Sequence, residues 1–138
     1  MLINSSLLKE HGYINGKWVG SDAKSRFDIK NAYTNEVIST LPDMGKKETD
    51  EAINAANEAW PDWRSRTAKE RAIILKKWFD LIMENQEDLA ILMTAEQGKP
   101  LAEARGEVGY GASFIEWFAE EGKRTYGDII PTPSNDRR

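Results

Sequence analysis

PLAEARGEVGYGASFIEWFAEEGKRTYG, residues 100–127, is the stretch that decides the fold of this chain. We expect one long helix here. Pro100 suits a first helical turn, where its missing N–H loses no partner, and Gly127 can end the helix. About 26 residues rising ~1.5 Å each make a rod of roughly 39 Å, longer than a small domain is wide.

Apolar residues occupy two sides of this expected helix. The aliphatic side holds Leu101, Ala104, Val108, Ala112, Ile115 and Ala119. The aromatic side holds Tyr110, Phe114, Trp117 and Phe118. A helix that is apolar on two sides requires protein on both, so we expect it to need more partners than a chain of 138 residues supplies.

Three glycines, Gly106, Gly109 and Gly111, lie inside the same stretch. Each costs roughly 1 kcal/mol relative to alanine in a helix. Their order is wrong for a dinucleotide fingerprint, no strand precedes them, and they fall in mid-helix instead of at a helix N-terminus. We therefore interpret them as positions where other backbone packs very close to the helix.

Composition excludes several classes of protein. The chain has 138 residues, 40% of them hydrophobic and 30% charged, which is typical of one soluble globular domain. Its net charge of −4 argues against a general nucleic-acid role. It has no cysteine and one histidine, His11, which excludes a disulfide, a thiolate or paired-histidine metal site and a cysteine nucleophile within it. No signal peptide or membrane-spanning run is present, so we expect no membrane association and a cytoplasmic location.

The first forty residues predict two small β-hairpins. Asn15-Gly16 lies between two apolar pairs, a strong signal for a two-residue turn in which both residues have positive φ. Phe27 and Ile29 alternate with charged residues, which predicts a strand with one buried face, and residues 36–41 can return antiparallel to it. Residues 5–9 predict a short helical turn.

From Gly45 onward the apolar period becomes helical. Ala52, Ile53, Ala56 and Trp60 share one face of a first helix, which we expect Pro61 to end. Thr67 and Glu70 have the spacing of a capping box for a second helix, and Gly98 suits a left-handed cap at the end of a third. We expect the second helix to present five residues to a core: Ile74, Leu75, Trp78, Leu81 and Ile82. We expect Asn85 to separate the second helix from the third, whose apolar stripe is Leu89, Leu92 and Met93.

These elements predict a mainly α fold with N-terminal β-hairpins. We divide the chain into an N-terminal segment with two hairpins (1–44), a helical layer (45–127) and an extended tail leading to a continuation (128–138). Ile129 and Ile130, followed by prolines, read as extended chain leaving the helical layer.

Few residues are candidates for chemistry. The glutamates of the long helix could form an acid/base pair, but on an amphipathic helix such residues more often make up the solvated face: Glu103, Glu107, Glu116, Glu120 and Glu121. Glu96 lies in a chain reversal, where a carboxylate and turning carbonyls can hold a hard cation, although a solvated glutamate is the simpler interpretation. The aromatic side of the long helix could line an apolar tunnel, or could serve core or interface packing.

Several stretches in combination resemble the N-terminal part of aldehyde dehydrogenases: YINGKW, TAKERAIILKKW, EQGKPLAEA and FIEWFAEEGKRTYGDIIP. Within that family they most resemble the succinate-semialdehyde dehydrogenases, and the resemblance covers essentially the whole chain. It implies that this chain is an N-terminal fragment of an α/β (Rossmann-like) fold, with residues 45–127 as the helical layer of the cofactor domain. The whole enzyme would be a homo-oligomer in which this chain contacts the remainder of its subunit.

The resemblance also implies a reaction: a cysteine thiolate attacks an aldehyde, hydride passes to NAD or NADP, and water releases the acid. The residues for these steps belong to later segments of the family pattern, so it assigns no catalytic and no cofactor-binding residue here, and we expect the chain alone to be inactive and to bind neither cofactor. It places Glu96 at a monovalent-cation site, together with backbone near Ile29, and places Tyr110 and Phe114 beside the aldehyde entry tunnel. The alternative hypothesis is a stand-alone helical interaction module from a truncated gene.

Overall fold

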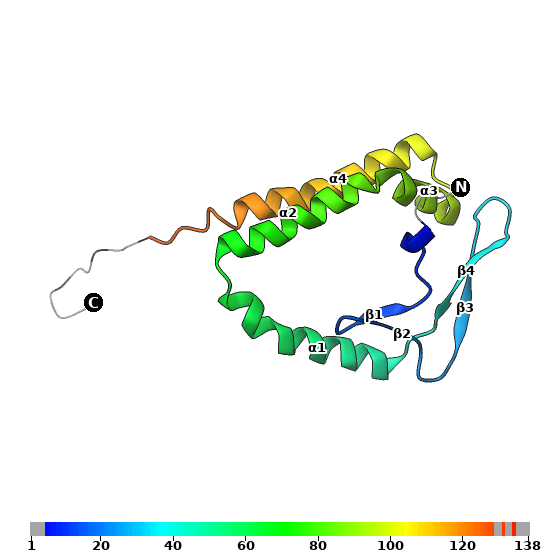
Figure 1. Ribbon diagram of the computed structural model, residues 1–138, viewed down its shortest axis with the longest axis horizontal. Helices are drawn as coiled ribbons and strands as arrows, with labels where there is room; N and C mark the ends of the chain where they lie inside the picture. The colour runs from blue at the N-terminus through cyan, green and yellow to red at the C-terminus, as the bar shows by residue number, and fades with distance from the viewer. Residues whose placement is uncertain (1–4, 129–130, 132–133, 135–138) are drawn as a thin grey trace.

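The computed structural model describes residues 5–128, 131 and 134. A single 3-10 turn and four short strands come first, and four helices follow (Figure 1). In chain order the elements are η1 (Ser5–Leu7), β1 (Gly12–Ile14), β2 (Lys17–Val19), β3 (Arg26–Lys30), β4 (Val37–Pro42), α1 (Lys46–Ser65), α2 (Ala68–Glu84), α3 (Gln86–Gln97) and α4 (Leu101–Glu121). The N-terminal hairpins and the mainly helical remainder confirm the predicted fold class. Ile129 and Ile130, predicted to be extended, lie outside the described residues.

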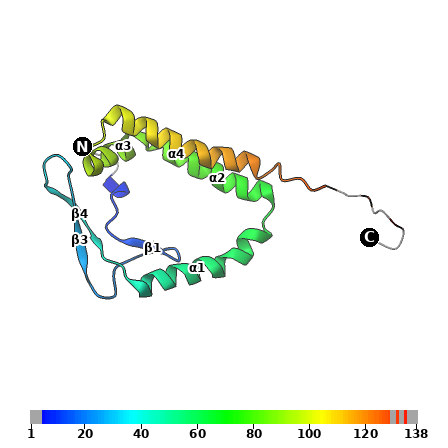
Figure 2. The same ribbon diagram turned by 180° about the vertical axis from the view of Figure 1, so that it is seen from behind.

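The helices do not form one bundle. α2 and α4 lie side by side along their length, and α3 packs against α4 at one end of the pair (Figure 1). α1 runs apart from this pair, and the two hairpins lie between its N-terminal end and α3 (Figures 1 and 2). Within the predicted helical layer (45–127), α2, α3 and α4 pack together and α1 lies apart from them.

Both hairpins form as the sequence predicts. β1 and β2 pair antiparallel with Tyr13 opposite Trp18, and their rings meet edge to face at 5.1 Å. Asn15 and Gly16 at the turn have φ of 48° and 75°, the positive values that a two-residue turn of this kind requires. β3 pairs with β4, with a register shift between Ile29 and Lys30. The predicted buried face of β3 is wrong at Phe27, which is 49% exposed, because nothing in the described chain covers it.

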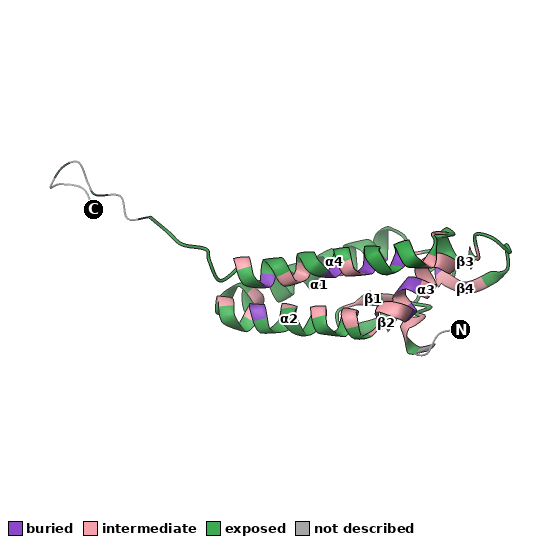
Figure 3. Ribbon diagram, turned by 90° about the horizontal axis from the view of Figure 1, so that it is seen from above, coloured by how far each residue is buried: buried purple, intermediate pink, exposed green. Residues whose placement is uncertain are grey.

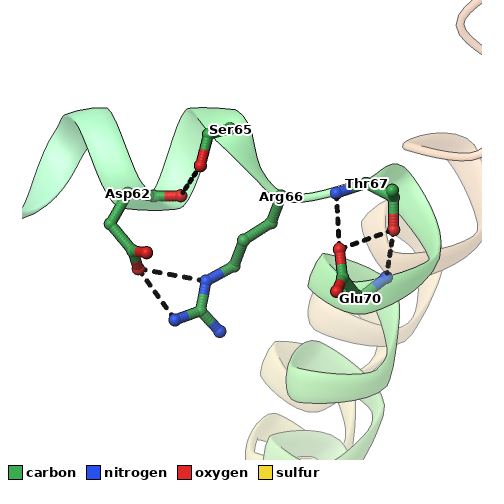
Figure 4. Close-up of polar contacts among 5 residues, drawn as sticks. All are labelled: Asp62, Ser65, Arg66, Thr67 and Glu70. Atoms are coloured by element: carbon green, nitrogen blue, oxygen red, sulfur yellow. Dashed lines mark hydrogen bonds and ion pairs between the residues drawn. The ribbon is translucent and has the colours of Figure 1, made fainter.

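Pro61 does not end the first helix, contrary to the sequence prediction. α1 continues through Pro61 to Ser65. Proline removes one hydrogen bond from a helix, but the flanking residues can keep helical angles. The helix ends where Arg66 adopts an extended conformation with ψ of 147°, and Arg66 ion-pairs with Asp62 at 2.8 Å (Figure 4).

The predicted capping box of α2 is confirmed. The Thr67 hydroxyl accepts a hydrogen bond from the Glu70 N–H at 3.2 Å, and Glu70 Oε2 accepts one from the Thr67 N–H at 2.8 Å (Figure 4). Bonding to the backbone N–H of Thr67 lowers the pKa of Glu70. The sharp break between α1 and α2 therefore owes more to this cap than to Pro61.

The third helix begins and ends at the predicted positions, although the Asn85 side chain makes no capping hydrogen bond to it. Asn85 separates α2 from α3, and its side-chain amide donates to the carbonyl of Leu81 at 2.8 Å. Gly98 has φ of 74° and its N–H donates to the Thr94 carbonyl at 2.8 Å, a left-handed C-terminal cap.

α4 is shorter than the helix that the sequence predicts. It begins at Leu101 and ends at Glu121, so its 21 residues extend for roughly 32 Å instead of reaching Gly127. Beyond it the N–H groups of Lys123 and Arg124 bond to carbonyls only three residues back, which tightens the chain into a turn.

The buried core is made of small side chains. Among the described residues the buried apolar ones are Ala72, Ala90, Ala104, Val108, Ala112 and Ala119. Four of these belong to the aliphatic side of α4, which confirms that this side packs inward (Figure 3). Because alanine has no long side chain, α2 and α3 can approach α4 closely.

The predicted core face of α2 is confirmed only in part. Ile74, Trp78 and Leu81, all predicted to face a core, are 41–55% exposed. Ile82 packs against the core cluster and Leu75 is half-buried, as predicted, while Ala72, which was not among the predicted residues, is buried. The sequence offers α2 two apolar stripes, and the one that contains the small Ala72 permits the closer approach to α4.

Candidate functional site

The end of α3 and the end of the second hairpin are held together by the backbone. The Ala32 N–H donates to the Ala95 carbonyl at 3.0 Å. Asn31 shapes the adjoining turn, because its side-chain oxygen accepts from the N–H groups of Tyr33 and Thr34 at 2.9 and 3.0 Å. This link brings the segment that contains Glu96 next to the segment that follows β3.

Glu96 and Ile29 are the residues for which the sequence suggests a monovalent-cation site. The structure places Glu96 on the surface at the end of α3 and leaves Ile29 half-buried in β3. In the part of the chain that the structure describes, no group of three or more histidine, cysteine, aspartate or glutamate side chains is placed to hold a metal ion. The cation site stays a prediction, supported by the proximity of the two segments.

The aromatic side of α4 is exposed in the described chain. We call Tyr110, Phe114, Trp117 and Phe118 the ring stripe. Their exposed fractions are 66%, 47%, 62% and 60%. Tyr110 and Phe114 meet edge to face with ring centroids 4.9 Å apart. The stripe is therefore a pre-ordered apolar surface.

Two open grooves meet at Phe114. One, of about 600 Å³, follows the outer side of α4 past Trp117 and Phe118. The other, of about 580 Å³, lies over the seam where α4 meets α2 and α3, and Tyr110 lines it. Tyr110 and Phe114, the predicted tunnel residues, thus share one groove, but what the groove accommodates stays a prediction.

The glycines of α4 have open surroundings. A Cβ atom added at Gly106 or Gly111 would meet no atom within 4 Å beyond the backbone of the helix itself. At Gly109 it would touch only the side-chain nitrogen of Gln86, at 3.4 Å. Within the described residues the expected close packing of other backbone is therefore wrong at all three glycines.

Charged side chains fix α3 on α4. Arg105 donates from two nitrogens to the Glu87 carboxylate at 2.6 and 2.8 Å, and Gln86 donates to the Arg105 carbonyl at 2.9 Å. The hydrogen bond from Arg105 lowers the pKa of Glu87, and the hydrogen bond from Lys123 likewise lowers the pKa of Glu120. Both carboxylates are thus engaged in ion pairs on the surface of the helices.

Sequence reasoning missed the role of Glu48. Its carboxylate is buried and accepts hydrogen bonds from the N–H groups of Asp22 and, at 2.9 Å, Gly45. The bond from the Asp22 N–H is the main cause of its lowered pKa. Lys47 adds an ion pair to Asp22 at 2.7 Å. The signal was present, since Glu48 stands three residues after Gly45 at the start of a helix, as in a capping box. Glu48 thus anchors the loop after the first hairpin to α1.

None of the helices in the described part of the chain combines the length and the apolar character needed to cross a lipid bilayer.

Residues 18–138 match the model of the aldehyde dehydrogenase family. The chain is 56% identical over 137 residues to the glutarate-semialdehyde dehydrogenase of Pseudomonas putida and 55% identical to the NADP(+) succinate-semialdehyde dehydrogenase of Escherichia coli. A 3-sulfolactaldehyde dehydrogenase of Pseudomonas putida is 53% identical. Each match covers 99% of this chain but only 28% of the relative.

Solved structures show the same backbone. An E. coli NADP-dependent enzyme superposes with a TM-score of 0.96 at 54% identity, covering 99% of this chain and 28% of that one. The succinate-semialdehyde dehydrogenase of Burkholderia pseudomallei gives a TM-score of 0.93 at 54% identity, covering 96% and 28%. A betaine aldehyde dehydrogenase of Staphylococcus aureus, solved with NAD+, gives 0.88 at 33% identity, covering 95% and 27%. The open arrangement of α1, the hairpins and the helical layer is thus also the arrangement of this segment in much longer chains.

Proposed function

The chain belongs to the aldehyde dehydrogenase family, and from that membership we propose that it forms the N-terminal portion of an NAD(P)-dependent semialdehyde dehydrogenase. The observation that carries the proposal is the match over 99% of this chain to 28% of relatives that are 55–56% identical. The full-length protein would oxidise the aldehyde group to a carboxylate.

The names of the relatives suggest a substrate class. Succinate semialdehyde, glutarate semialdehyde and 3-sulfolactaldehyde are short aldehydes that each carry a carboxylate or a sulfonate. We assign the full-length protein the same class, with succinate semialdehyde as the first compound to test. The cofactor is NAD or NADP, since one relative is named for NADP(+) and one structure was solved with NAD+.

This chain contributes scaffold and no reacting group. It has no cysteine, so the thiolate of a thiohemiacetal must come from another part of the protein. The described sheets are two-stranded and antiparallel, whereas the dinucleotide site of a Rossmann fold is built on parallel strands. The residues present do not fit a nicotinamide cofactor, and we assign the chain no step that involves one.

Two supporting roles complete the proposal. Tyr110 and Phe114 border the path by which the aldehyde enters, because they share an apolar groove beside the helical seam. Glu96 and the backbone at Ile29 contribute to a monovalent-cation site, because the Ala32–Ala95 hydrogen bond holds their segments together. The full-length protein would be a cytoplasmic homo-oligomer, which size measurement and cell fractionation would test.

The test is a chimera. Residues 1–138 would replace the matching 28% of the E. coli succinate-semialdehyde dehydrogenase, and NADP⁺ reduction would be measured with succinate semialdehyde. We expect kcat/KM within about tenfold of the intact E. coli enzyme, because the two segments share their backbone and more than half of their residues. The truncated E. coli remainder serves as the control. A soluble, correctly assembled chimera without activity would refute the proposal.

A further inference from the structure

A third open groove, of about 480 Å³, lies between the start of α2 and the end of α4, away from α3 (Figure 1). Four lysines line it: Lys69, Lys76 and Lys77 from α2, and Lys123 from the turn after α4. The acidic side chains of its lining are Asp80 and Glu120. Cations therefore outnumber carboxylates here, in a chain whose net charge is −4. We call this feature the lysine groove.

Internal ion pairs engage two of the four lysines. Lys76 pairs with Asp80 at 2.8 Å, and Lys123 pairs with Glu120 at 2.7 Å. Lys69 and Lys77 are exposed, and neither makes an ion pair within the part of the chain that the structure describes. The lysine groove therefore offers two ammonium groups to an incoming anion.

These two cations flank an apolar side chain on α2. Ile73 lies four residues after Lys69 and four residues before Lys77, so the three residues form one row along the helix. Ile73 is 59% exposed, and the methylene stems of the lysines extend the apolar surface around it. Eight residues separate the two lysines, which places them about 12 Å apart along the helix axis. A ligand that meets the whole row needs two negative charges at that spacing, with an apolar group between them.

This requirement discriminates between kinds of ligand. A single phosphate or carboxylate group is too small to reach both lysines, which lie about 12 Å apart along the axis. An anionic lipid surface would be repelled by Glu116 and Glu121, which line the neighbouring groove on α4. A purely apolar segment would leave two ammonium groups buried without a partner, which is costly.

A helix meets the requirement. Its residues i, i+4 and i+8 lie along one face, so two carboxylates and one aliphatic side chain can be presented at the spacing of the row on α2. Two helices that lie side by side, as α2 and α4 do, form a surface on which a third helix can pack. The glutamates of α4 would direct the acidic face of such a helix toward α2.

We propose that the lysine groove is a docking surface for an acidic amphipathic helix of a partner protein. Carboxylates at positions i and i+8 of that helix pair with Lys69 and Lys77, and an aliphatic side chain at i+4 covers Ile73. The inference does not rest on the proposed function, because no residue of the lysine groove has a role in it.

The experiment uses a synthetic helical peptide as the probe. It carries glutamate at positions i and i+8 and leucine at i+4, on a helix that is otherwise rich in alanine and glutamine. Heteronuclear NMR would follow the amides of the 138-residue chain as the peptide is added. We expect saturable one-to-one binding with Kd below ~1 mM at low salt, and the largest shifts around Lys69, Ile73 and Lys77. Binding should weaken roughly fivefold at high salt, because exposed ion pairs are screened.

Substitutions in the row separate charge from apolar contact. Lys69→Glu and Lys77→Glu should each weaken binding roughly fivefold at low salt. Ile73→Ser should weaken it at low and at high salt alike, because an apolar contact is not screened. A peptide with lysine in place of both glutamates should not bind the unmodified chain, but should bind the variant that combines Lys69→Glu with Lys77→Glu.

Lys17→Glu is the matched control. Lys17 is exposed in β2, outside the lysine groove, and the substitution changes the net charge of the chain by the same amount. It should leave Kd within about twofold of the unmodified chain. Circular dichroism would verify that all variants keep their helix content.

Four results would each overturn the inference. They are no saturable binding at low salt, equal binding of the two peptides to the unmodified chain, an equal loss of affinity in Lys17→Glu, and shifts that map away from the row on α2. Two further results would assign the groove to another occupant and would also overturn it. One is self-association of the chain that Lys77→Glu abolishes, and the other is binding to vesicles of anionic lipid that the same variant abolishes.

Discussion

Ala112 and Gly111 are adjacent residues of α4 that should respond in opposite ways to the same substitution. Ala112 is 1% exposed and lies on the side packed against α2 and α3. Gly111 has no atom within 4 Å of its missing Cβ beyond the backbone of its own helix. Leucine gives both positions the same final side chain, so the two variants differ in the surroundings that this side chain meets and in the helix propensity of the residue replaced.

The magnitudes follow from these surroundings. Ala112→Leu overfills a closed contact, which costs about 1–3 kcal/mol of the free energy of unfolding. Gly111→Leu meets no obstacle and replaces glycine by a good helix former, a gain of roughly 0.8 kcal/mol. At about 4 °C per kcal/mol for a chain of this size, the melting temperature should fall by ~4–12 °C in the first variant and rise by ~3 °C in the second.

Far-UV circular dichroism with thermal and urea unfolding would measure both variants. Helix content at low temperature should stay close to that of the unmodified chain, because leucine favours helices. If Ala112→Leu melts at the original temperature, or if both variants shift in the same direction, then the alanine side of α4 is not the packed side and the assignment of the ring stripe as the free side is wrong.

Three further predictions can be tested on the chain alone. It should not reduce NAD⁺ or NADP⁺ with succinate semialdehyde, since it has no cysteine; turnover by material free of host enzymes would contradict this. Calorimetry should detect no saturable binding of either cofactor, and a micromolar dissociation constant would refute this reasoning. Glu48 should contribute fully to the free energy of unfolding above its ordinary pKa of 4.5. This contribution should be lost as the pH falls through the lower pKa of Glu48 in the folded state, because the Asp22 N–H bonds well only to the ionised carboxylate. Hydrogen exchange at the Asp22 amide should speed up as this hydrogen bond is lost, and Glu48→Gln should remove that dependence on pH. An unchanged pH response in the variant would show that Glu48 does not anchor the Asp22 loop.

Local signals in the sequence predicted local structure well. The turn at Asn15-Gly16, the Thr67–Glu70 capping box and the Gly98 cap each act through one or two backbone hydrogen bonds or φ angles. The structure that each adopts therefore depends only on residues close to it in the chain. The family resemblance predicted the fold class for the same reason, since it rests on contiguous stretches with fixed spacing.

Predictions that depended on distant partners were less successful. α2 carries more apolar residues than one face can hold. The face that contains Ala72 is the buried one, because the small side chain of Ala72 allows α4 to approach closely. Pro61 carried a strong sign of helix termination, yet the next cap fixed the boundary four residues later, at Ser65. Glu48 acquired its role only when the Asp22 loop reached it from another element.

The distribution of side-chain size in α4 connects these observations to function. Folded domains usually bury large apolar side chains such as Ile, Leu and Phe as well as small ones. Here the described core consists of five alanines and one valine, while Tyr110, Trp117 and Phe118 are 60–66% exposed. In the full-length protein proposed above, a helix whose small side meets two neighbours and whose large side meets none would be the middle layer of a thicker structure. The reacting groups would likewise lie in segments that the relatives carry outside the 28% matched here.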